Sequence, residues 1–174
     1  KLLWKQWGGT ITGVYIDVGP NYAVSRQVFY TWKSKPLAEI IRPLNKWSNN
    51  LMARSLVYSI GGTVYGAPAT REKGIEAIKQ YISRQGISVS NLLIENGSGL
   101  SRSTRATASL INDIFRRAWS SPNMPEFVAS LSIAGKDGTT RNRFKGSKFG
   151  GKMRIKTGTM KNVSSAGGYV FGAS

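Results

Sequence analysis

The residues of this chain best suited to chemistry form a Lys-Thr-Gly triplet, Lys156, Thr157 and Gly158. An ammonium and a hydroxyl side by side can bind a carboxylate, and a glycine lets a substrate backbone lie against a strand. Far upstream, Ser48 and Asn50 lie in a predicted loop after a helix. The serine can pass a proton, and the asparagine amide can bind an amide carbonyl. Together the two motifs predict serine acyl transfer on a peptide that ends in a carboxylate.

Each of these motifs, taken alone, has a simpler explanation. Ser48 and Asn50 are both good residues to begin a helix, and Lys156 can protect an edge strand from aggregation. The glycine loop at residues 96–99 lacks the ending of a P-loop, so a plain loop is the simpler interpretation than a phosphate site. The densest basic tract either binds a phosphate backbone or is a solvated loop. It consists of Arg141, Arg143, Lys145, Lys148, Lys152, Arg154 and Lys156, interleaved with Phe144 and Phe149.

Composition limits the possible chemistry. The 174 residues, 40% of them hydrophobic, fit one globular domain, and no apolar run approaches the ~18 residues of a membrane span. The chain has no cysteine, which excludes disulfides and thiolate metal sites, and no histidine, which excludes Ser-His-Asp and Cys-His catalysis within it. The net charge of +17 makes nucleic acid, anionic lipid or an acidic polymer candidate partners, or reflects a solvated basic surface.

Hydrophobic periodicity predicts a helical middle with strand-like ends. Short strands are expected at residues 10–15 and 27–32 with a turn at residues 17–21, and a brief buried strand or an extended segment at residues 92–94. After a turn at residues 135–138, a strand should lead to Lys156 and form a hairpin with residues 166–171. This order predicts a mixed α/β (α+β) architecture, with a helical subdomain beside an antiparallel sheet.

The predicted helices share an apolar stripe at helical spacing and a recognisable start or stop residue. They are a helix capped by Ser34 that Pro43 kinks or ends, a helix over residues 51–60 closed by Gly61 and Gly62, a helix from Thr70 to Gly86, a helix opened by Ser103 or Thr104 and ended by Pro122, and a short helix at residues 126–132.

In their order along the chain, these pieces resemble the class C low-molecular-mass penicillin-binding proteins, the D-alanyl-D-alanine carboxypeptidases of peptidase family S13. Ser-x-Asn and Lys-Thr-Gly are shared with all penicillin-recognising enzymes. Gly-Ser-Gly-Leu-Ser-Arg at residues 97–102 and Ala-Gly-x-Asp-Gly-Thr at residues 134–139 are more specific to this family. With further matches at residues 36–40, 45–53 and 68–71, the resemblance covers nearly the whole chain. It implies part of a penicillin-binding protein/β-lactamase-like transpeptidase fold.

The resemblance also implies what the chain lacks. Family members carry a nucleophilic serine and its lysine base in a Ser-x-x-Lys motif, with inserted domains between it and Ser-x-Asn. No serine of this chain is followed by lysine three residues later. Residues 1–174 are therefore expected to be the later part of the D,D-peptidase domain, without the nucleophile segment, the inserted domains and the C-terminal end, and inactive without a companion segment or chain. Asn96 stands where the family usually has aspartate.

The implied activity is that of a serine-type carboxypeptidase/endopeptidase, which cleaves peptidoglycan stem peptides through an acyl-enzyme and is acylated by β-lactams. Ser48 would relay a proton to the leaving amine with help from Lys156, and Asn50 would hold the substrate amide. Lys156 and Thr157 would bind the terminal carboxylate, Gly158 would allow close approach, and the backbone N–H of Thr159 would join the oxyanion hole. A pocket for the diaminopimelate end of the peptide would be formed by Gly99, Leu100, Arg102 and Met160.

The resemblance implies no cofactor and no metal ion. It implies a bacterial protein of the periplasm or cell envelope, and it argues against a nucleic-acid partner. Two alternatives stay open: a basic module that binds nucleic acid or an anionic polymer, and a non-catalytic relative that binds peptidoglycan.

Overall fold

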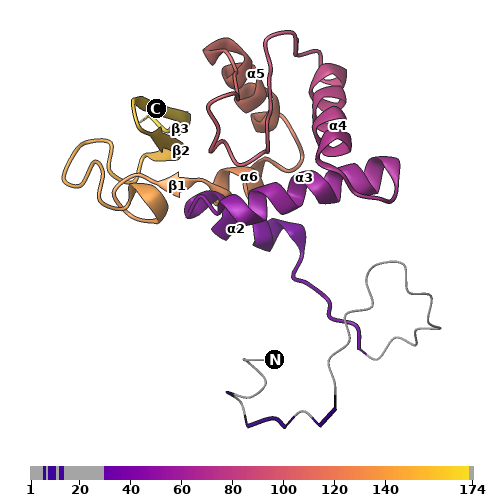
Figure 1. The fold of residues 1–174 in the computed structure, drawn as a ribbon. Helices are drawn as coiled ribbons and strands as arrows, with labels where there is room; N and C mark the ends of the chain where they lie inside the picture. Colours follow the sequence, from indigo (N-terminus) through magenta and orange to yellow (C-terminus); the bar gives the residue numbers. More distant parts are fainter. Residues whose placement is uncertain (1–5, 7, 11, 14–29, 173–174) are drawn as a thin grey trace. The chain divides into compact units, whose positions relative to one another are not determined.

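The computed structural model describes residues 6, 8–10, 12–13 and 30–172. The chain divides into two units, Lys1–Ser34 and Lys35–Ser174, and the named helices and strands belong to the second (Figure 1). The strands predicted at residues 10–15 and 27–32 are not seen at the described positions 10, 12, 13 and 30–32. Their remaining residues, and the turn predicted at 17–21, lie outside the described residues.

Helix α2 (Leu37–Lys46) leads to the Ser48 loop. Its N-cap is Pro36, which offers no side-chain hydrogen bond, so the cap predicted at Ser34 is wrong. Pro43 does not end the helix, which continues to Lys46. A proline inside a helix removes one backbone hydrogen bond and crowds the carbonyl group four residues before it, but the buried Leu44 in the last turn holds the helix against the rest of the fold.

Helices α3 (Asn50–Tyr65) and α4 (Arg71–Arg84) pack closely because glycines remove side chains from their crossing. The end predicted for α3 at Gly61 is wrong, because the helix passes this residue. A Cβ at Gly61 would lie 2.6 Å from the backbone nitrogen of Gly74, and one at Gly74 would lie 2.0 Å from the carbonyl oxygen of Val57. These glycines therefore serve helix packing and not helix termination.

The start and end predicted for α4 are confirmed. Thr70 Oγ1 accepts a hydrogen bond of 3.3 Å from the backbone N–H of Lys73, and Gly86 follows the helix with a φ of +78°. The short helix α6 (Met124–Ser130) begins and ends two residues earlier than predicted.

Helix α5 (Ala108–Trp119) begins later than predicted. Its N-cap is Thr107, whose hydroxyl accepts a hydrogen bond of 3.1 Å from the backbone N–H of Leu110. The predicted caps, Ser103 and Thr104, instead donate their backbone N–H groups to the hydroxyl of Ser101. Several residues near the start of this helix carry a hydroxyl that could cap it, and the turn around Ser101 engages Ser103 and Thr104 before the helix begins.

The sheet has three antiparallel strands in the order β1 (Ser132–Ile133), β2 (Met153–Met160), β3 (Val163–Val170). The predicted hairpin is confirmed, as is the mixed helical and antiparallel architecture. Strand β1 pairs only with Arg154 and Ile155 of β2. Among the described residues, the second half of β2 is therefore paired with β3 alone.

Aromatic packing holds β3 against α5. The ring of Tyr169 meets that of Phe115 edge-on at 5.4 Å and lies 5.0 Å from that of Trp119. The hydroxyl of Tyr169 also donates a 2.6 Å hydrogen bond to the carbonyl oxygen of Phe115. This cluster fixes the hairpin, and with it the Lys-Thr-Gly triplet, relative to the helices.

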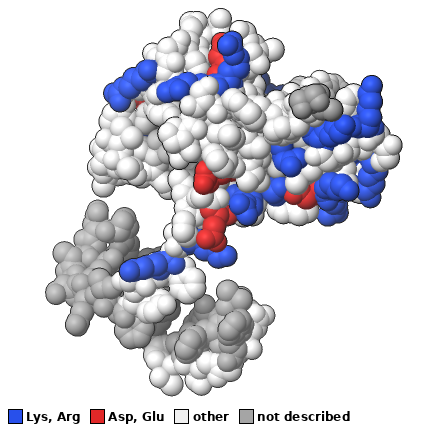
Figure 2. All heavy atoms as spheres, turned by 180° about the vertical axis from the view of Figure 1, so that it is seen from behind, with Lys and Arg blue, Asp and Glu red and all other residues white. Residues whose placement is uncertain are grey.

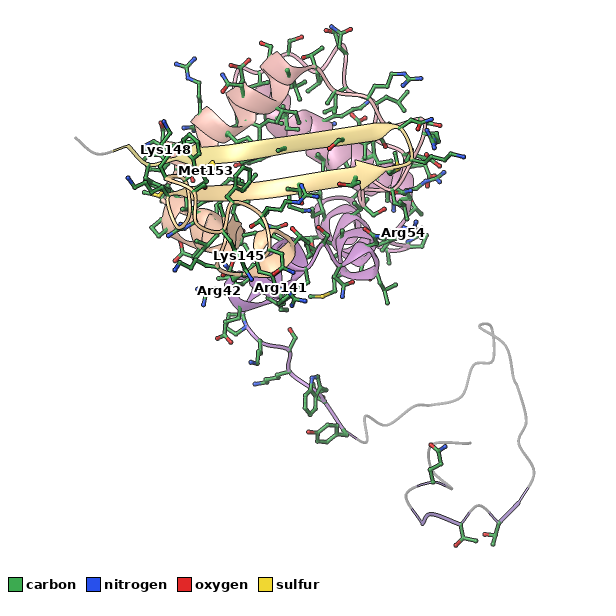
Figure 3. The ribbon with its side chains drawn as sticks, turned by 90° about the vertical axis from the view of Figure 1, so that its left-hand side faces the viewer. Arg42, Arg54, Arg141, Lys145, Lys148 and Met153 are labelled. Carbon is green, nitrogen blue, oxygen red and sulfur yellow. The ribbon has the colours of Figure 1, made fainter. Side chains whose placement is uncertain are left out.

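Among the charged side chains, lysine and arginine outnumber aspartate and glutamate, and Figure 2 shows them spread over one face. In Figure 3 the β2–β3 hairpin crosses the front of the molecule, and Arg42, Arg141 and Lys145 project below it. None of the helices in the described part of the chain is both long and apolar enough to cross a membrane.

Candidate active site

A cleft of about 1070 Å³ lies between α5, the glycine loop at residues 96–99 and the β2–β3 hairpin. Of the residues predicted for the site, Arg102 is exposed and does not line this cleft. The others all line it: Ser48, Asn50, Gly99, Leu100, Lys156, Thr157, Gly158, Thr159 and Met160. Groups far apart in the sequence thus converge on one cavity, while the role predicted for each remains a prediction.

Ser48 occupies a left-handed backbone conformation, with a φ of +52°. For a residue other than glycine this conformation is uncommon and costs about 1 kcal/mol. The neighbouring Asn49 caps α3, accepting a hydrogen bond of 3.0 Å from the backbone N–H of Met52. The simple explanation, a residue that begins a helix, therefore applies to Asn49, and it does not account for Ser48.

The side chain of Lys156 connects the hairpin to the Ser48 loop. Its Nζ donates hydrogen bonds to Ser48 Oγ and, at 2.9 Å, to the carbonyl oxygen of Thr157. None of the ion pairs of the described residues includes Lys156. Burial lowers the pKa of Lys156, because the ammonium loses hydration that no carboxylate replaces. The site therefore holds a half-buried cation that an anionic ligand can pair with.

The free edge of β2, which no strand of the described residues covers beyond Ile155, belongs to residues that line the same cleft. The backbone N–H of Ala134, just after β1, donates to the carbonyl oxygen of Met153 at 3.1 Å, so odd-numbered residues of β2 direct their backbone groups toward the β1 side. The register with β3 has no interruption. Because this direction alternates along a strand, the backbone groups of Thr157 and Thr159 face the edge that β1 does not reach. An extended peptide can add to such an edge.

Comparison with known proteins shows to which family the chain belongs. The sequence pattern of the D-Ala-D-Ala carboxypeptidase 3 (S13) family matches residues 2–174. The chain belongs to this family. The resemblance inferred from the motifs is thereby confirmed.

Two curated relatives carry corresponding names. The chain is 39% identical over 174 residues to a D-alanyl-D-alanine carboxypeptidase of Actinomadura sp. strain R39, with 95% of this chain and 32% of that protein covered. It is 28% identical over 148 residues to the D-alanyl-D-alanine carboxypeptidase DacB of Haemophilus influenzae, with 80% of this chain and 30% of that protein covered. The chain thus spans about a third of the length of these relatives.

Solved structures show the same fold. The crystal structure of penicillin-binding protein 4 (dacB) from Haemophilus influenzae matches with a TM-score of 0.74 at 28% identity, covering 79% of this chain and 31% of that one. A structure of the same protein complexed with a novel β-lactam matches with a TM-score of 0.73 at 28% identity, covering 79% of this chain and 32% of that one.

A brace that the sequence reasoning missed joins the end of α2 to β1. Lys46 forms an ion pair with Asp137, in which their side chains are only 15% and 34% exposed. Lys46 Nζ also donates to the carbonyl oxygen of Leu131 at 3.1 Å, and Ser132 Oγ donates to the carbonyl oxygen of Lys46 at 3.2 Å. The brace fixes the backbone just before Ser48 relative to the sheet that carries Lys156. Its sequence signal was the Asp of the family's Ala-Gly-x-Asp-Gly-Thr turn.

Asn96 shapes the glycine loop, which lines the cleft together with the β2–β3 hairpin. Its Oδ1 accepts hydrogen bonds from the backbone N–H and the hydroxyl of Ser98, at 2.9 and 2.8 Å. Its Nδ2 donates to the carbonyl oxygen of Leu100 at 3.3 Å. Because a carboxylate can accept but cannot donate, an aspartate here would lose the last of these contacts.

Further residues that line the cleft were not predicted. They include Ser98 and Thr104 of the glycine-loop region, Ile111 and Phe115 of α5, and Ser165 and Ala166 of β3. The β3 residues could have been found as the hairpin partners of the Lys-Thr-Gly strand. Among the residues that the structure describes, no three His, Cys, Asp or Glu side chains form a group that could hold a metal ion.

Proposed function

We propose that the complete protein is a serine-type D-alanyl-D-alanine carboxypeptidase/endopeptidase of the bacterial periplasm or cell envelope. It would cleave peptidoglycan stem peptides through an acyl-enzyme, and β-lactams would acylate the same serine. The observation that carries this proposal is the hydrogen bond from Lys156 to Ser48 within a cleft that Asn50 and the Lys-Thr-Gly triplet also line. The names of the relatives support it.

Substrate binding would begin with the terminal carboxylate. Lys156 supplies a half-buried ammonium and Thr157 a hydroxyl, and a charge-assisted hydrogen bond is about twice as strong as a neutral one. The peptide backbone would lie along the free edge of β2, where Gly158 offers no side chain that could obstruct it. The amide of Asn50, at the start of α3, would hold the substrate amide from the other side of the cleft.

The bond-breaking steps need a serine that this chain does not contain. A Ser-x-x-Lys segment, elsewhere in the complete protein or in a companion chain, would supply the nucleophile and its lysine base. The serine oxygen would attack the carbonyl between the two D-alanines, and the backbone N–H of Thr159 would bind the resulting oxyanion together with that of the nucleophile. Each such donor is worth about 3 kcal/mol.

Ser48 would then relay a proton to the leaving amine, giving up its own hydrogen and taking one from Lys156. Its hydroxyl accepts a hydrogen bond from Lys156, so its own proton is directed away from that ammonium and into the cleft. Water would hydrolyse the acyl-enzyme to release the shortened peptide. The side chain of the peptide would contact Gly99, Leu100 and Met160, because these residues line the same cleft. Arg102 does not line the cleft, so it would reach the peptide only from outside.

The test uses the complete protein with two readouts: covalent labelling by a fluorescent penicillin and release of D-alanine from a stem peptide. Both should occur in the wild type, and Ser48→Ala should slow both at least about tenfold, the loss that a misplaced proton donor commonly causes. Ser83→Ala, on the exposed face of α4, is the matched control and should behave as the wild type.

Two other outcomes would overturn the proposal. A nucleic-acid-binding module would ignore penicillin and bind DNA with an affinity that falls steeply with salt. A non-catalytic relative would bind peptidoglycan but neither become labelled nor release D-alanine.

A further inference from the structure

We propose that Thr139 is a positioning residue that aims the hydroxyl of Thr157 at the carboxylate of the substrate. The inference rests on the proposed function and extends it to a residue with no assigned role. Thr139 belongs to the short 3₁₀ helix Gly138–Thr140, which follows the Asp137 turn, and it does not line the cleft. It acts on the substrate through Thr157 alone.

The contacts form a line of hydroxyl groups that leads away from the cleft. Thr139 Oγ1 lies 3.1 Å from Thr157 Oγ1 and 3.5 Å from Ser132 Oγ. Ser132 in turn donates to the carbonyl oxygen of Lys46 at 3.2 Å, and its side chain is fully buried. The line therefore ends on a fixed backbone acceptor.

The fixed end determines which way the other hydroxyls can point. Each hydroxyl carries one hydrogen, and that of Ser132 is held by the carbonyl oxygen of Lys46. Ser132 can therefore only accept from Thr139. Thr139 is exposed, and its one hydrogen has two protein acceptors within reach, Ser132 and Thr157, of which Thr157 is the nearer.

A substrate carboxylate resolves this choice. A carboxylate can only accept, so Thr157 must turn its hydrogen toward it, which leaves the lone pairs of Thr157 free to accept from Thr139. A hydroxyl that accepts one hydrogen bond becomes a better donor in another. Thr139 would therefore hold the Thr157 rotamer and strengthen its bond to the anion. The effect is selective for substrates with a free terminal carboxylate.

The experiment compares two peptides in the complete protein: a stem peptide ending in D-Ala-D-Ala and the same peptide with a terminal carboxamide. Single-turnover release of D-alanine or its amide gives kcat/KM for each. Thr139→Val removes the hydroxyl but keeps the branched shape. It should lower kcat/KM for the carboxylate peptide by about 3- to 10-fold, the loss expected for one hydrogen bond, and leave the carboxamide peptide within about 2-fold. Thr139→Ser should restore most of the carboxylate rate.

Thr63→Val, the same substitution at an exposed position of α3, is the control. If Thr139→Val matches Thr63→Val with both peptides while the wild type turns over normally, the inference fails and the proposed function stands. Equal losses with both peptides would make Thr139 a purely structural residue and would also refute the inference. A wild type that releases nothing and is not labelled by penicillin would refute the proposed function itself.

Discussion

Replacing Gly138 by alanine tests whether the turn after β1 fixes the position of Ser48. Gly138 has a φ of +55°, a conformation that costs alanine about 1 kcal/mol. A Cβ at this position would lie 2.3 Å from Ser132 Oγ and 2.6 Å from the carbonyl oxygen of Lys46. The second distance is roughly 0.8 Å short of the 3.4 Å at which ordinary contact begins, and backbone cannot rotate away. Overpacking of this kind costs about 1–3 kcal/mol, so the total loss of stability should be about 2–4 kcal/mol.

Urea denaturation of the complete protein measures this loss, and Gly146→Ala is the matched control. Gly146 has a φ of +71°, and a methyl group added there would have no atom of the described residues within 4 Å, so the conformational cost is the only penalty that alanine meets from them. Gly138→Ala should therefore lose about 1–3 kcal/mol more than Gly146→Ala. Where it remains folded, it should also react more slowly with fluorescent penicillin, because Lys46 adjoins the Ser48 loop. Equal destabilisation of the two variants would refute the packing argument, and unchanged labelling would refute the link to Ser48.

Three further predictions concern the cleft and its support. Burial lowers the pKa of Lys156 below the ordinary 10.5, so as the pH rises the ammonium should lose its proton, and turnover should begin to decline, before pH 10.5 is reached. Lys156→Arg keeps the cation, so the alkaline limb of its pH–rate profile should move to higher pH. An unmoved limb would assign the titration to another group. Tyr169→Phe should cost about 1 kcal/mol in urea denaturation, since the hydrogen bond to Phe115 is lost, and no loss would contradict this. Gly158→Ala should leave the melting temperature nearly unchanged, because among the described residues only the rotatable Ser165 hydroxyl would lie within 3 Å of the added methyl group. It should nevertheless lower D-alanine release at least about tenfold, and equal turnover would show that the substrate does not pass over Gly158.

The fold was predictable from the sequence where local chemistry decides it. The Thr70 cap and the β2–β3 hairpin follow from a helix-capping hydroxyl and from strand alternation, which neighbouring residues settle between themselves. The end of α3 was not predictable, because Gly61 suits either a helix end or a close helix crossing. Only its contact with Gly74, on another helix, decides between the two.

The site was predictable to the extent that its groups contact the cleft. The triplet beginning at Lys156 and the Ser48 motif were found from residue types suited to a carboxylate and a proton transfer. Their supports were not found. The chain has 25 lysines and arginines, and nothing in the sequence distinguishes Lys46, which pairs with Asp137 91 positions away. Thr139 was not predicted either, because its partner Thr157 lies on a different element.

The net charge of +17 and Lys156, the one cation among the described residues that line the cleft, carry different weight for function. The basic residues of the loop at 141–148 are exposed and hydrated, so each gains at most about 1 kcal/mol from an opposite charge. Lys156 is half-buried and has given up hydration, so an anion that reaches it meets a lower effective dielectric and a stronger attraction. From position 138 onward the chain contains no aspartate or glutamate, so the segment that carries Lys156 offers it no acidic partner. The proposed preference for a carboxylate ligand would therefore follow from the burial of one lysine, and it would persist if the surface charge were neutralised.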